Sequence, residues 1–189
     1  MNVTALLVMD VQQGIVTRFA EDEGYLSRLL AAIAAARTAG IPVVYVTIHF
    51  RPGYPEVSAR NASFSAISAA GRFVAGSPDT EIHPAVAPQP EDVVVVKRRV
   101  SAFTGSDLDV VLRGLGADTL VLTGIATSGV VLSTLRQAAD LDYRLTVLAD
   151  ACLDADPEVH RVLTEKVFPR QAAVRTVAQW TAELGGAPG

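Results

Sequence analysis

Two side chains that can exchange protons, and one short turn, stand directly behind apolar runs in this sequence. Asp10 and Lys97 each follow such a run, and a turn at residues 124–130, which contains two glycines, follows a third. A carboxylate or an ammonium in these surroundings is partly desolvated, and each makes the charge of the other tolerable. The spacing therefore predicts either a structural ion pair or an acid/base pair, with a cap on the following turn as a further alternative for Asp10.

The segment 120–139 organises the rest of the chain, because its hydrophobic period changes near Ser128. The first half is an apolar run that suits a buried strand, and the second half has helical spacing. One helical face carries four apolar residues: Val131, Leu132, Leu135 and Ala139. In an open α/β sheet such a strand-to-helix junction lies at the carboxyl end of a strand, where helix-start N–H groups point into a crevice. We therefore expect the functional site there.

Strands and helices alternate along the remaining sequence. Apolar runs predict further strands at 5–9, 42–48, 93–96, 144–148 and 172–175. Helical spacing and end signals predict helices from Tyr25 to a stop at Gly40, over 106–115, from Asp156-Pro157 onward, and through Trp180. The alternation predicts an α/β fold with a mostly parallel six-stranded sheet, in a single domain over 1–184 with a frayed tail at 185–189.

A long insert separates the predicted strand at 42–48 from the next one. Its segment 51–57, together with Asn61 and Phe64, suggests a folded flap over the crevice. Aromatic residues there and nearby could wall an apolar pocket: Phe19, Phe50, Tyr54, Phe64 and Phe103. Among them we favour pocket contact only for Phe103.

Composition excludes several classes of function. The 189 residues are half hydrophobic, with a net charge of -4 and basic residues scattered except at 97–99, so no nucleic-acid partner is expected. No apolar run reaches membrane-spanning length, and the N-terminus lacks a signal peptide. The single cysteine, Cys152, cannot form an internal disulfide. We expect a cytoplasmic protein without a membrane partner.

The three segments carry a resemblance to a known family. Asp10 in Leu-Leu-Val-Met-Asp-Val-Gln, Lys97 in Val-Val-Lys-Arg-Arg-Val-Ser-Ala-Phe, and the run from Gly124 to Thr134 resemble the signature segments of the isochorismatase-like hydrolases, or cysteine hydrolase superfamily. The similarity extends from about residue 5 to residue 180. It implies a Rossmann-like three-layer α/β/α fold.

The resemblance also implies roles for individual residues. The amidases of this family use an Asp, Lys and Cys triad, and by motif Asp10 is the acid/base and Lys97 its partner. A cis peptide bond would join Ile125 to Ala126, and the amides of Ala126 and Val130 would bind the oxyanion. The sequence departs from the pattern at Val130, which stands where the amidases carry their nucleophilic cysteine. Because removal of such a nucleophile costs on the order of a millionfold in rate, the usual thiol chemistry is absent.

No other residue is an obvious replacement for the thiol. Cys152 lies at the end of the next strand, and we interpret it as a buried, inert cysteine. Hydroxyls near the turn, at Ser128, Ser133 and Thr134, are more often helix caps than nucleophiles.

Two functional hypotheses remain open. The first is a hydrolase of a small amide, urea or vinyl ether that uses Asp10 and Lys97; isochorismatases proper, which the fold resembles, use such an aspartate as an acid without a cysteine. The surrounding segments look more like the small-amide hydrolases. The second is a catalytically silent member that binds a small ligand or serves as an assembly subunit.

No cofactor or metal is expected. The nicotinamidase-like members bind a metal through an aspartate and several histidines, whereas here the corresponding region supplies only His49 and, much later, His83. We expect His49, Phe103 and Ser128 to line the pocket and His160 to be exposed on a helix. The partner is a small-molecule substrate or ligand, and a homo-oligomer, dimer or higher, is expected.

Overall fold

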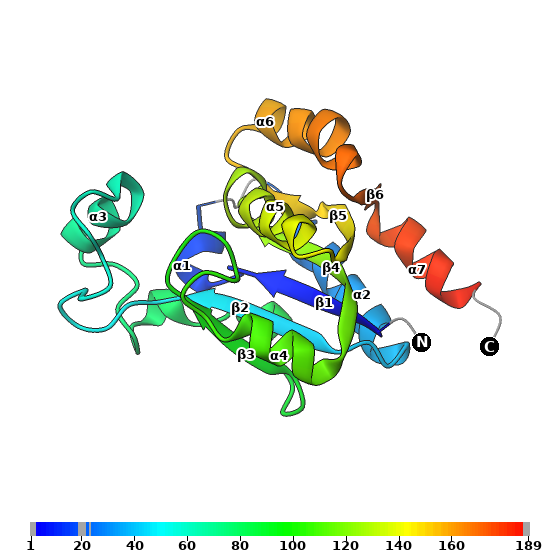
Figure 1. The fold of residues 1–189 in the computed structure, drawn as a ribbon, viewed down its shortest axis with the longest axis horizontal. Coiled ribbons are helices and arrows are strands. Elements are labelled where there is room, and N and C mark those ends of the chain that lie inside the picture. Colours follow the sequence, from blue (N-terminus) through cyan, green and yellow to red (C-terminus); the bar gives the residue numbers. More distant parts are fainter. Residues whose placement is uncertain (1–2, 19–21, 23, 187–189) are drawn as a thin grey trace.

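The strands form one sheet that brings the predicted segments to a common edge. The computed structural model describes residues 3–18, 22 and 24–186. Its six-stranded sheet has the order β3-β2-β1-β4-β5-β6, and each strand is parallel to its neighbours (Figure 1). The strands are β1 (Val3–Met9), β2 (Val43–Ile48), β3 (Val93–Lys97), β4 (Ala117–Ile125), β5 (Arg144–Leu153) and β6 (Ala173–Arg175). The α/β prediction is confirmed, with a sheet that is parallel throughout.

Burial explains why the central strands read as continuous apolar runs. Every residue from Ala5 to Met9 in β1 is at most 1 % exposed, on both faces of the sheet. A parallel sheet of this kind must be covered on both sides, because its crossover connections place helices over each face.

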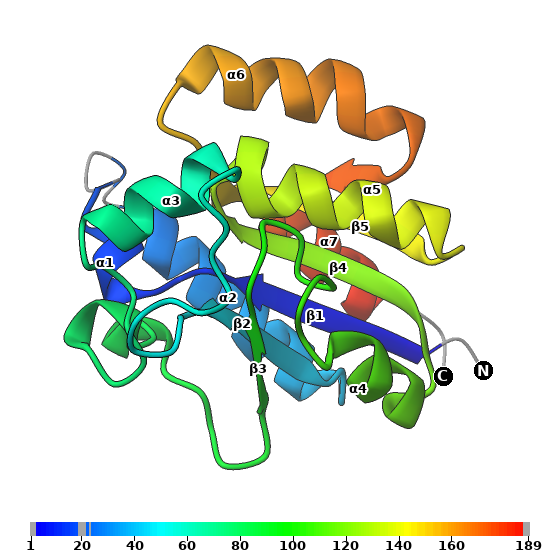
Figure 2. The same cartoon turned by 60° about the vertical axis from the view of Figure 1, so that its left-hand side comes forward.

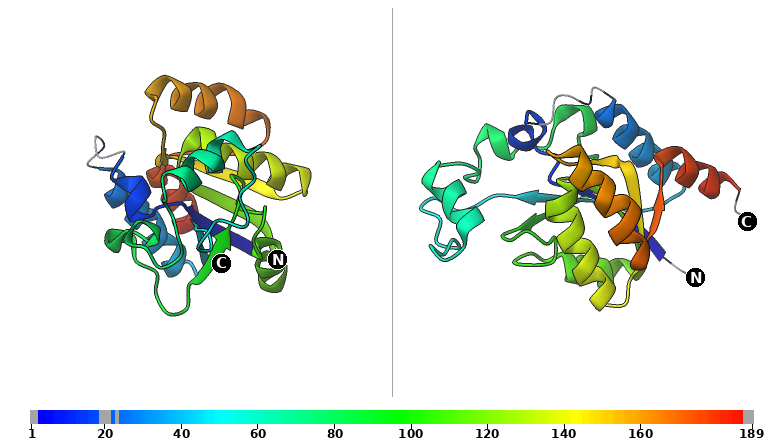
Figure 3. Two further views of the ribbon diagram at one scale, coloured as in Figure 1. Left: turned by 90° about the vertical axis from the view of Figure 1, so that its left-hand side faces the viewer. Right: turned by 90° about the horizontal axis from the view of Figure 1, so that it is seen from above.

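Two apolar clusters fill the space between the sheet and its helices. Apolar residues at three- and four-residue spacing in α4 (Leu108–Leu115) and α5 (Leu132–Asp140) pack on one face. Those of α2 (Tyr25–Thr38) and α7 (Val177–Gly185) pack on the other face. Figure 3 shows the two helical layers on either side of the sheet. Residues 187–189 of the predicted tail lie outside the described residues, and Gly185 is the last residue of α7.

Helix ends follow the predicted capping signals. Helix α6 (Pro157–Val162) begins after Asp156, whose carboxylate accepts a hydrogen bond from the N–H of Glu158 at 2.8 Å. Helix α4 ends at Gly116, which has a φ of 69°. It begins at Leu108 rather than at 106, because the Ser106 hydroxyl donates back to the carbonyl of Ala102.

Strand β5 is longer than the sequence predicted. It continues beyond residue 148 to Leu153, because its pairing with β4 resumes after an irregularity between Leu122 and Gly124. Gly124 then pairs with Cys152, and Ile125 pairs with Leu153. The extension places Cys152 in the sheet, beside the turn that follows β4.

The insert after β2 forms a flap beyond the carboxyl ends of the strands. It contains α3 (Ala62–Ala69) and two short 3₁₀ turns, and α3 stands away from the sheet (Figure 1). Its base is joined to the sheet by the N–H of Phe50, which donates to Phe73. Figure 2 shows α3 on the side of the molecule where α5 begins and close to α1 (Gln13–Val16). No helix in the described part of the chain is long and apolar enough to cross a membrane.

Candidate active site

Asp10 and Lys97 form a buried ion pair at the carboxyl ends of β1 and β3. The Lys97 Nζ lies 2.8 Å from Asp10 Oδ2, and the two side chains are 2 % and 9 % exposed. The ammonium also donates to the carbonyl of Arg99 at 3.1 Å. Burial raises the pKa of the Asp10 carboxyl, although the charge and hydrogen bond of Lys97 act in the opposite direction. The sequence placed these residues at one edge, and the structure brings them into contact.

One oxygen of Asp10 is left without a partner. Oδ1 is buried and accepts no hydrogen bond from any described residue, while Oδ2 contacts Lys97. A buried, unpaired carboxylate oxygen is costly unless a ligand or water completes it. Such an oxygen, on a carboxyl with a raised pKa, is suited to take and return a proton.

The backbone sets the position of the pair. Asp10 has a φ of 58°, in the left-handed region that aspartate tolerates better than most residues, and its N–H donates to Val46 at 2.8 Å. Lys97 is the last residue of β3 and pairs in register with Ile48. The strand ends, rather than a loop, therefore hold both charged groups.

The turn after β4 requires its first glycine. Gly124 has a φ of 134°, and a Cβ at this position would lie 2.1 Å from the carbonyl oxygen of Met9. Only glycine allows β1 and β4 to approach so closely. The peptide bond between Ile125 and Ala126 is cis, as the resemblance implied. A π-helical turn, Thr127–Val131, then leads into α5.

A cavity of about 230 Å³ contains the ion pair and the turn. Asp10, Lys97, Ala126, Gly129 and Val130 line it. Val130 is only 2 % exposed, and its isopropyl group can neither attack a carbonyl nor transfer a proton. The arrangement can perform acid/base chemistry with a polar backbone turn, but its turn supplies no thiol.

The flap lines another side of this cavity, and most of its contributing side chains were not singled out from the sequence. The further lining residues, from the flap and from neighbouring segments, are Ile15, Arg18, Ile48, Ser63, Phe64, Ile67, Phe73, Val100 and Ile125. Phe64 and Ile67 lie one helical turn apart on α3, a spacing that would have predicted a shared face. Phe64, considered as a wall residue, does line the cavity. Phe19 lies outside the described residues.

Three predicted pocket residues are not brought to the cavity lining. Phe103 packs in the core against Tyr143, with 6.0 Å between ring centroids, because the segment after β3 is tied to α5. The Ser128 N–H donates to Asp154 at 2.6 Å, and Ser128 is exposed. His49 follows Ile48, which does line the cavity, and successive residues of an extended chain point to opposite sides.

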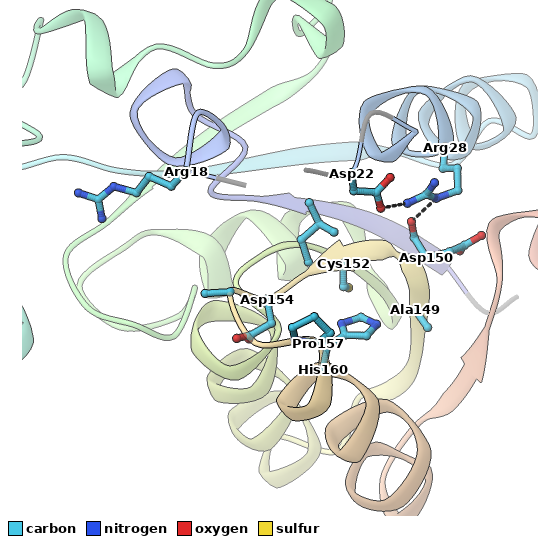
Figure 4. A pocket seen from close by; sticks show the side chains of 11 residues that line it. Arg18, Asp22, Arg28, Ala149, Asp150, Cys152, Asp154, Pro157 and His160 are labelled. Carbon is cyan, nitrogen blue, oxygen red and sulfur yellow. Dashed lines mark hydrogen bonds and ion pairs between the residues drawn. The ribbon is translucent and has the colours of Figure 1, made fainter. Parts of the chain in front are cut away.

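A second cavity, of about 440 Å³, lies at the carboxyl end of β5 (Figure 4). Cys152, Pro157 and His160 gather on one side of it, and the Asp22–Arg28 ion pair lies on the other. Cys152 is 2 % exposed, and burial raises the pKa of its thiol to about 12. The thiol is therefore protonated near neutral pH and a poor nucleophile.

His160 is half-buried rather than exposed, which corrects the prediction. Its Nδ1 lies 2.8 Å from the Thr127 hydroxyl, so helix α6 is tied to the turn before α5. Burial lowers the pKa of His160. The hydroxyl of Thr134, another alternative, accepts from the N–H of Ala102 and is fully buried.

The described residues contain no group of three or more His, Cys, Asp or Glu side chains that could hold a metal ion. His49 and His83, the two histidines considered at the sequence level, therefore do not form part of such a group within this part of the chain.

Comparison with known proteins gives matches over almost the whole chain. Residues 4–179 match the family described as Isochorismatase domain. A ureidoacrylate amidohydrolase of Methylobacterium radiotolerans is 34 % identical, over 96 % of this chain and 80 % of the relative. The structure of an isochorismatase family protein from Burkholderia thailandensis matches with a TM-score of 0.82 and 32 % identity, over 97 % of this chain and 96 % of the other. An N-carbamoylsarcosine amidase from Thermoplasma acidophilum matches with a TM-score of 0.72 and 28 % identity, over 93 % and 96 %.

Proposed function

Because this chain belongs to the isochorismatase family, we propose that it hydrolyses a small amide, ureido or vinyl ether compound with Asp10 as the acid/base and Lys97 as its partner. Val130 stands at the position of the usual nucleophile, so water is the attacking group. The observation that carries the proposal is the buried Asp10–Lys97 pair with one carboxylate oxygen unpartnered, in the wall of a cavity.

An amide or ureido substrate is the first choice. Two of the matched proteins are named for hydrolysis of such groups, ureidoacrylate in one case and N-carbamoylsarcosine in the other. The cavity is small, about 230 Å³, and mostly apolar, which suits a compact substrate with few polar groups.

The reaction needs one proton to move twice. Asp10 Oδ1 accepts a proton from water as the water oxygen bonds to the substrate carbonyl carbon. The amides of Ala126 and Val130 donate to the oxyanion that forms. When the carbon–nitrogen bond breaks, Asp10 returns the proton to the leaving nitrogen. Lys97 keeps the carboxylate oriented and compensates its negative charge.

A substrate panel tests this function. The protein is incubated with amides, ureido compounds and vinyl ethers, and product formation is compared with that of Asp10→Asn. Loss of the proton-transfer group is expected to lower kcat by at least about a hundredfold. Turnover that survives Asp10→Asn contradicts the role of Asp10, and Asp109→Asn, an exposed carboxylate change on α4, is the control.

The second candidate is a catalytically silent protein that binds a small ligand or acts as an assembly subunit. Val130 favours this function, because it lines the cavity with an apolar side chain that cannot act as a nucleophile. This function predicts saturable ligand binding with no product from any compound of the panel.

The domain organisation, the location and the oligomeric state of the protein are also proposals. We propose a single domain over 1–184, a cytoplasmic location, and a homo-oligomer in which the flap or α5 packs against another copy. Light scattering at the monomer mass would contradict the oligomer.

A further inference from the structure

Arg18 stands where the candidate active site opens. It follows α1, and its N–H donates to the carbonyl of Ile15, another lining residue, at 3.0 Å. Arg18 lines both cavities and is exposed. Arg18 is therefore placed to meet a group that enters the smaller cavity from solvent.

Within the part of the chain that the structure describes, the surroundings of this cavity are basic, although the chain carries a net charge of -4. Asp10 and Lys97 compensate each other. Arg72 lies over the ring of Phe73, 4.9 Å from its centroid, and Arg99 lies over that of Phe64 at 5.8 Å.

Among the described residues, the charged side chains that line the cavity or contact its lining are mostly basic. They are Arg18, Arg72, Lys97, Arg98 and Arg99, against Asp10 and Asp79, and Asp79 lies 3.8 Å from Arg72. Glu56, which pairs with Arg98, adds one further carboxylate. A local excess of positive charge in a hollow attracts small anions and raises their rate of association.

The interior of the cavity restricts where an anionic group can lie. Its flap wall consists mainly of Phe64, Ile67 and Phe73, which offer a carboxylate no hydrogen bonds. Asp10 would repel a carboxylate placed next to the reacting carbonyl. An anionic substrate therefore fits with its carbonyl beside Asp10 and its charged end toward the mouth, where Arg18 lies.

We propose that the substrate is a small acid that carries its scissile amide or ureido group at one end and a carboxylate at the other, and that Arg18 binds the carboxylate. This inference rests on the proposed function. A planar guanidinium can donate two parallel hydrogen bonds to a carboxylate, which fixes the orientation of the substrate as well as its affinity. Arg18 is thus a specificity residue, outside the proton-transfer pair.

The test compares two compounds that differ only in charge. 3-Ureidopropionate carries both groups, and 3-ureidopropionamide replaces the carboxylate with a neutral amide of similar size. Binding of each is measured by titration calorimetry at low and high salt, with the unaltered protein, Arg18→Gln, Arg18→Lys and Arg60→Gln. Arg60 is an exposed arginine of the flap outside the cavity lining, so it is the matched control.

We expect the acid to bind about tenfold more tightly than the amide, as for one charge-assisted contact at a partly exposed site. Arg18→Gln should bring the two affinities within about twofold of each other, whereas Arg18→Lys should retain part of the preference and Arg60→Gln all of it. High salt should weaken binding of the acid only.

The outcomes separate the inference from the function beneath it. Equal affinity for the two compounds, or a preference that survives Arg18→Gln, overturns the inference. A preference that depends on Arg18, without turnover of either compound, supports the inference and contradicts the proposed hydrolysis. Failure of both compounds to bind contradicts both.

Discussion

Two cavities share Arg18 in their lining, one at the buried ion pair and one at the carboxyl end of β5, and they differ in more than size. The larger holds the only thiol of the chain and a histidine, but burial raises the pKa of that thiol to about 12. The smaller holds a buried ion pair whose carboxylate keeps one oxygen unpartnered. The comparison favours the smaller cavity as the candidate site, because a buried charged group without full compensation is a stronger indication of function than residue types or cavity volume.

A thiol moved from one cavity to the other should give the largest effect. Val130→Cys in a Cys152→Ala background places the only thiol beside Asp10 and Lys97, where a base and a positive charge favour the thiolate. We expect a gain in amide or ureido hydrolysis of at least about a hundredfold, and alkylation by iodoacetamide at least about tenfold faster than that of Cys152 in the unaltered protein. Steady-state kinetics and mass spectrometry measure the two.

An introduced thiol that is neither reactive nor catalytic would show that the smaller cavity has lost the amidase geometry, and would favour the silent binder.

The wall of the smaller cavity depends on Gln12. This fully buried amide donates to the carbonyls of Ile48 and Thr80, at 3.0 and 2.7 Å, and accepts from the N–H of Ile48 at 2.8 Å. Gln12→Ala removes hydrogen bonds to three backbone groups, two of them buried, and should lower the free energy of unfolding by about 2–3 kcal/mol in denaturant titration. Gln13→Ala, which removes an exposed bond to Glu81, should cost less than about 0.5 kcal/mol. Equal effects would contradict a structural role specific to Gln12.

The pH dependence of hydrolysis should follow the ionisation of Asp10 in the smaller cavity. If Asp10 acts first as a base on an amide or ureido substrate, its ionised form is required. Turnover should then fall about tenfold per pH unit below the pKa of Asp10, which burial raises above the ordinary pKa of an aspartate. A vinyl ether, which needs the protonated acid, should show the opposite slope.

His160→Gln, a substitution in the larger cavity, should leave the pH at which turnover falls unchanged. A fall in turnover whose midpoint moves with His160→Gln, or lies below the ordinary pKa of an aspartate for an amide substrate, would contradict the assignment to Asp10.

The smallest effect on turnover should come from substitution of Cys152 in the larger cavity. Cys152→Ala is expected to change kcat by less than about twofold and to lower the free energy of unfolding by about 1 kcal/mol through lost packing. Cys152→Ser is the companion variant, because it retains the volume. Loss of turnover in both variants, with folding intact, would move the chemistry to the larger cavity.

The fold and the central pair could be predicted because they depend on local patterns and one general rule. Apolar runs mark the strands, parallel strands end at the same edge, and residues such as Asp10 and Lys97 that follow the runs must meet there. The register of β1 with β4, Met9 opposite Gly124, then brings the turn alongside.

The far wall of the site could not be predicted in the same way. Arg18 and Phe73 reach the cavity from segments without a hydrophobic period, and the position of Phe73 depends on tertiary contacts such as the hydrogen bond from the N–H of Phe50. Phe103 was misplaced because its segment is hydrogen-bonded to α5, a contact that sequence spacing does not reveal. His160 was expected in solvent because its partner, Thr127, is distant in sequence.

Gly124 has a consequence for redesign of this scaffold. Any side chain at this position would collide with the Met9 carbonyl and separate the strand that presents Asp10 from the turn that faces it. A mutant library aimed at new substrates should therefore keep this position constant and diversify Ser63 of α3, which lines the cavity but is outside the apolar cluster that joins Phe64 to Ile48.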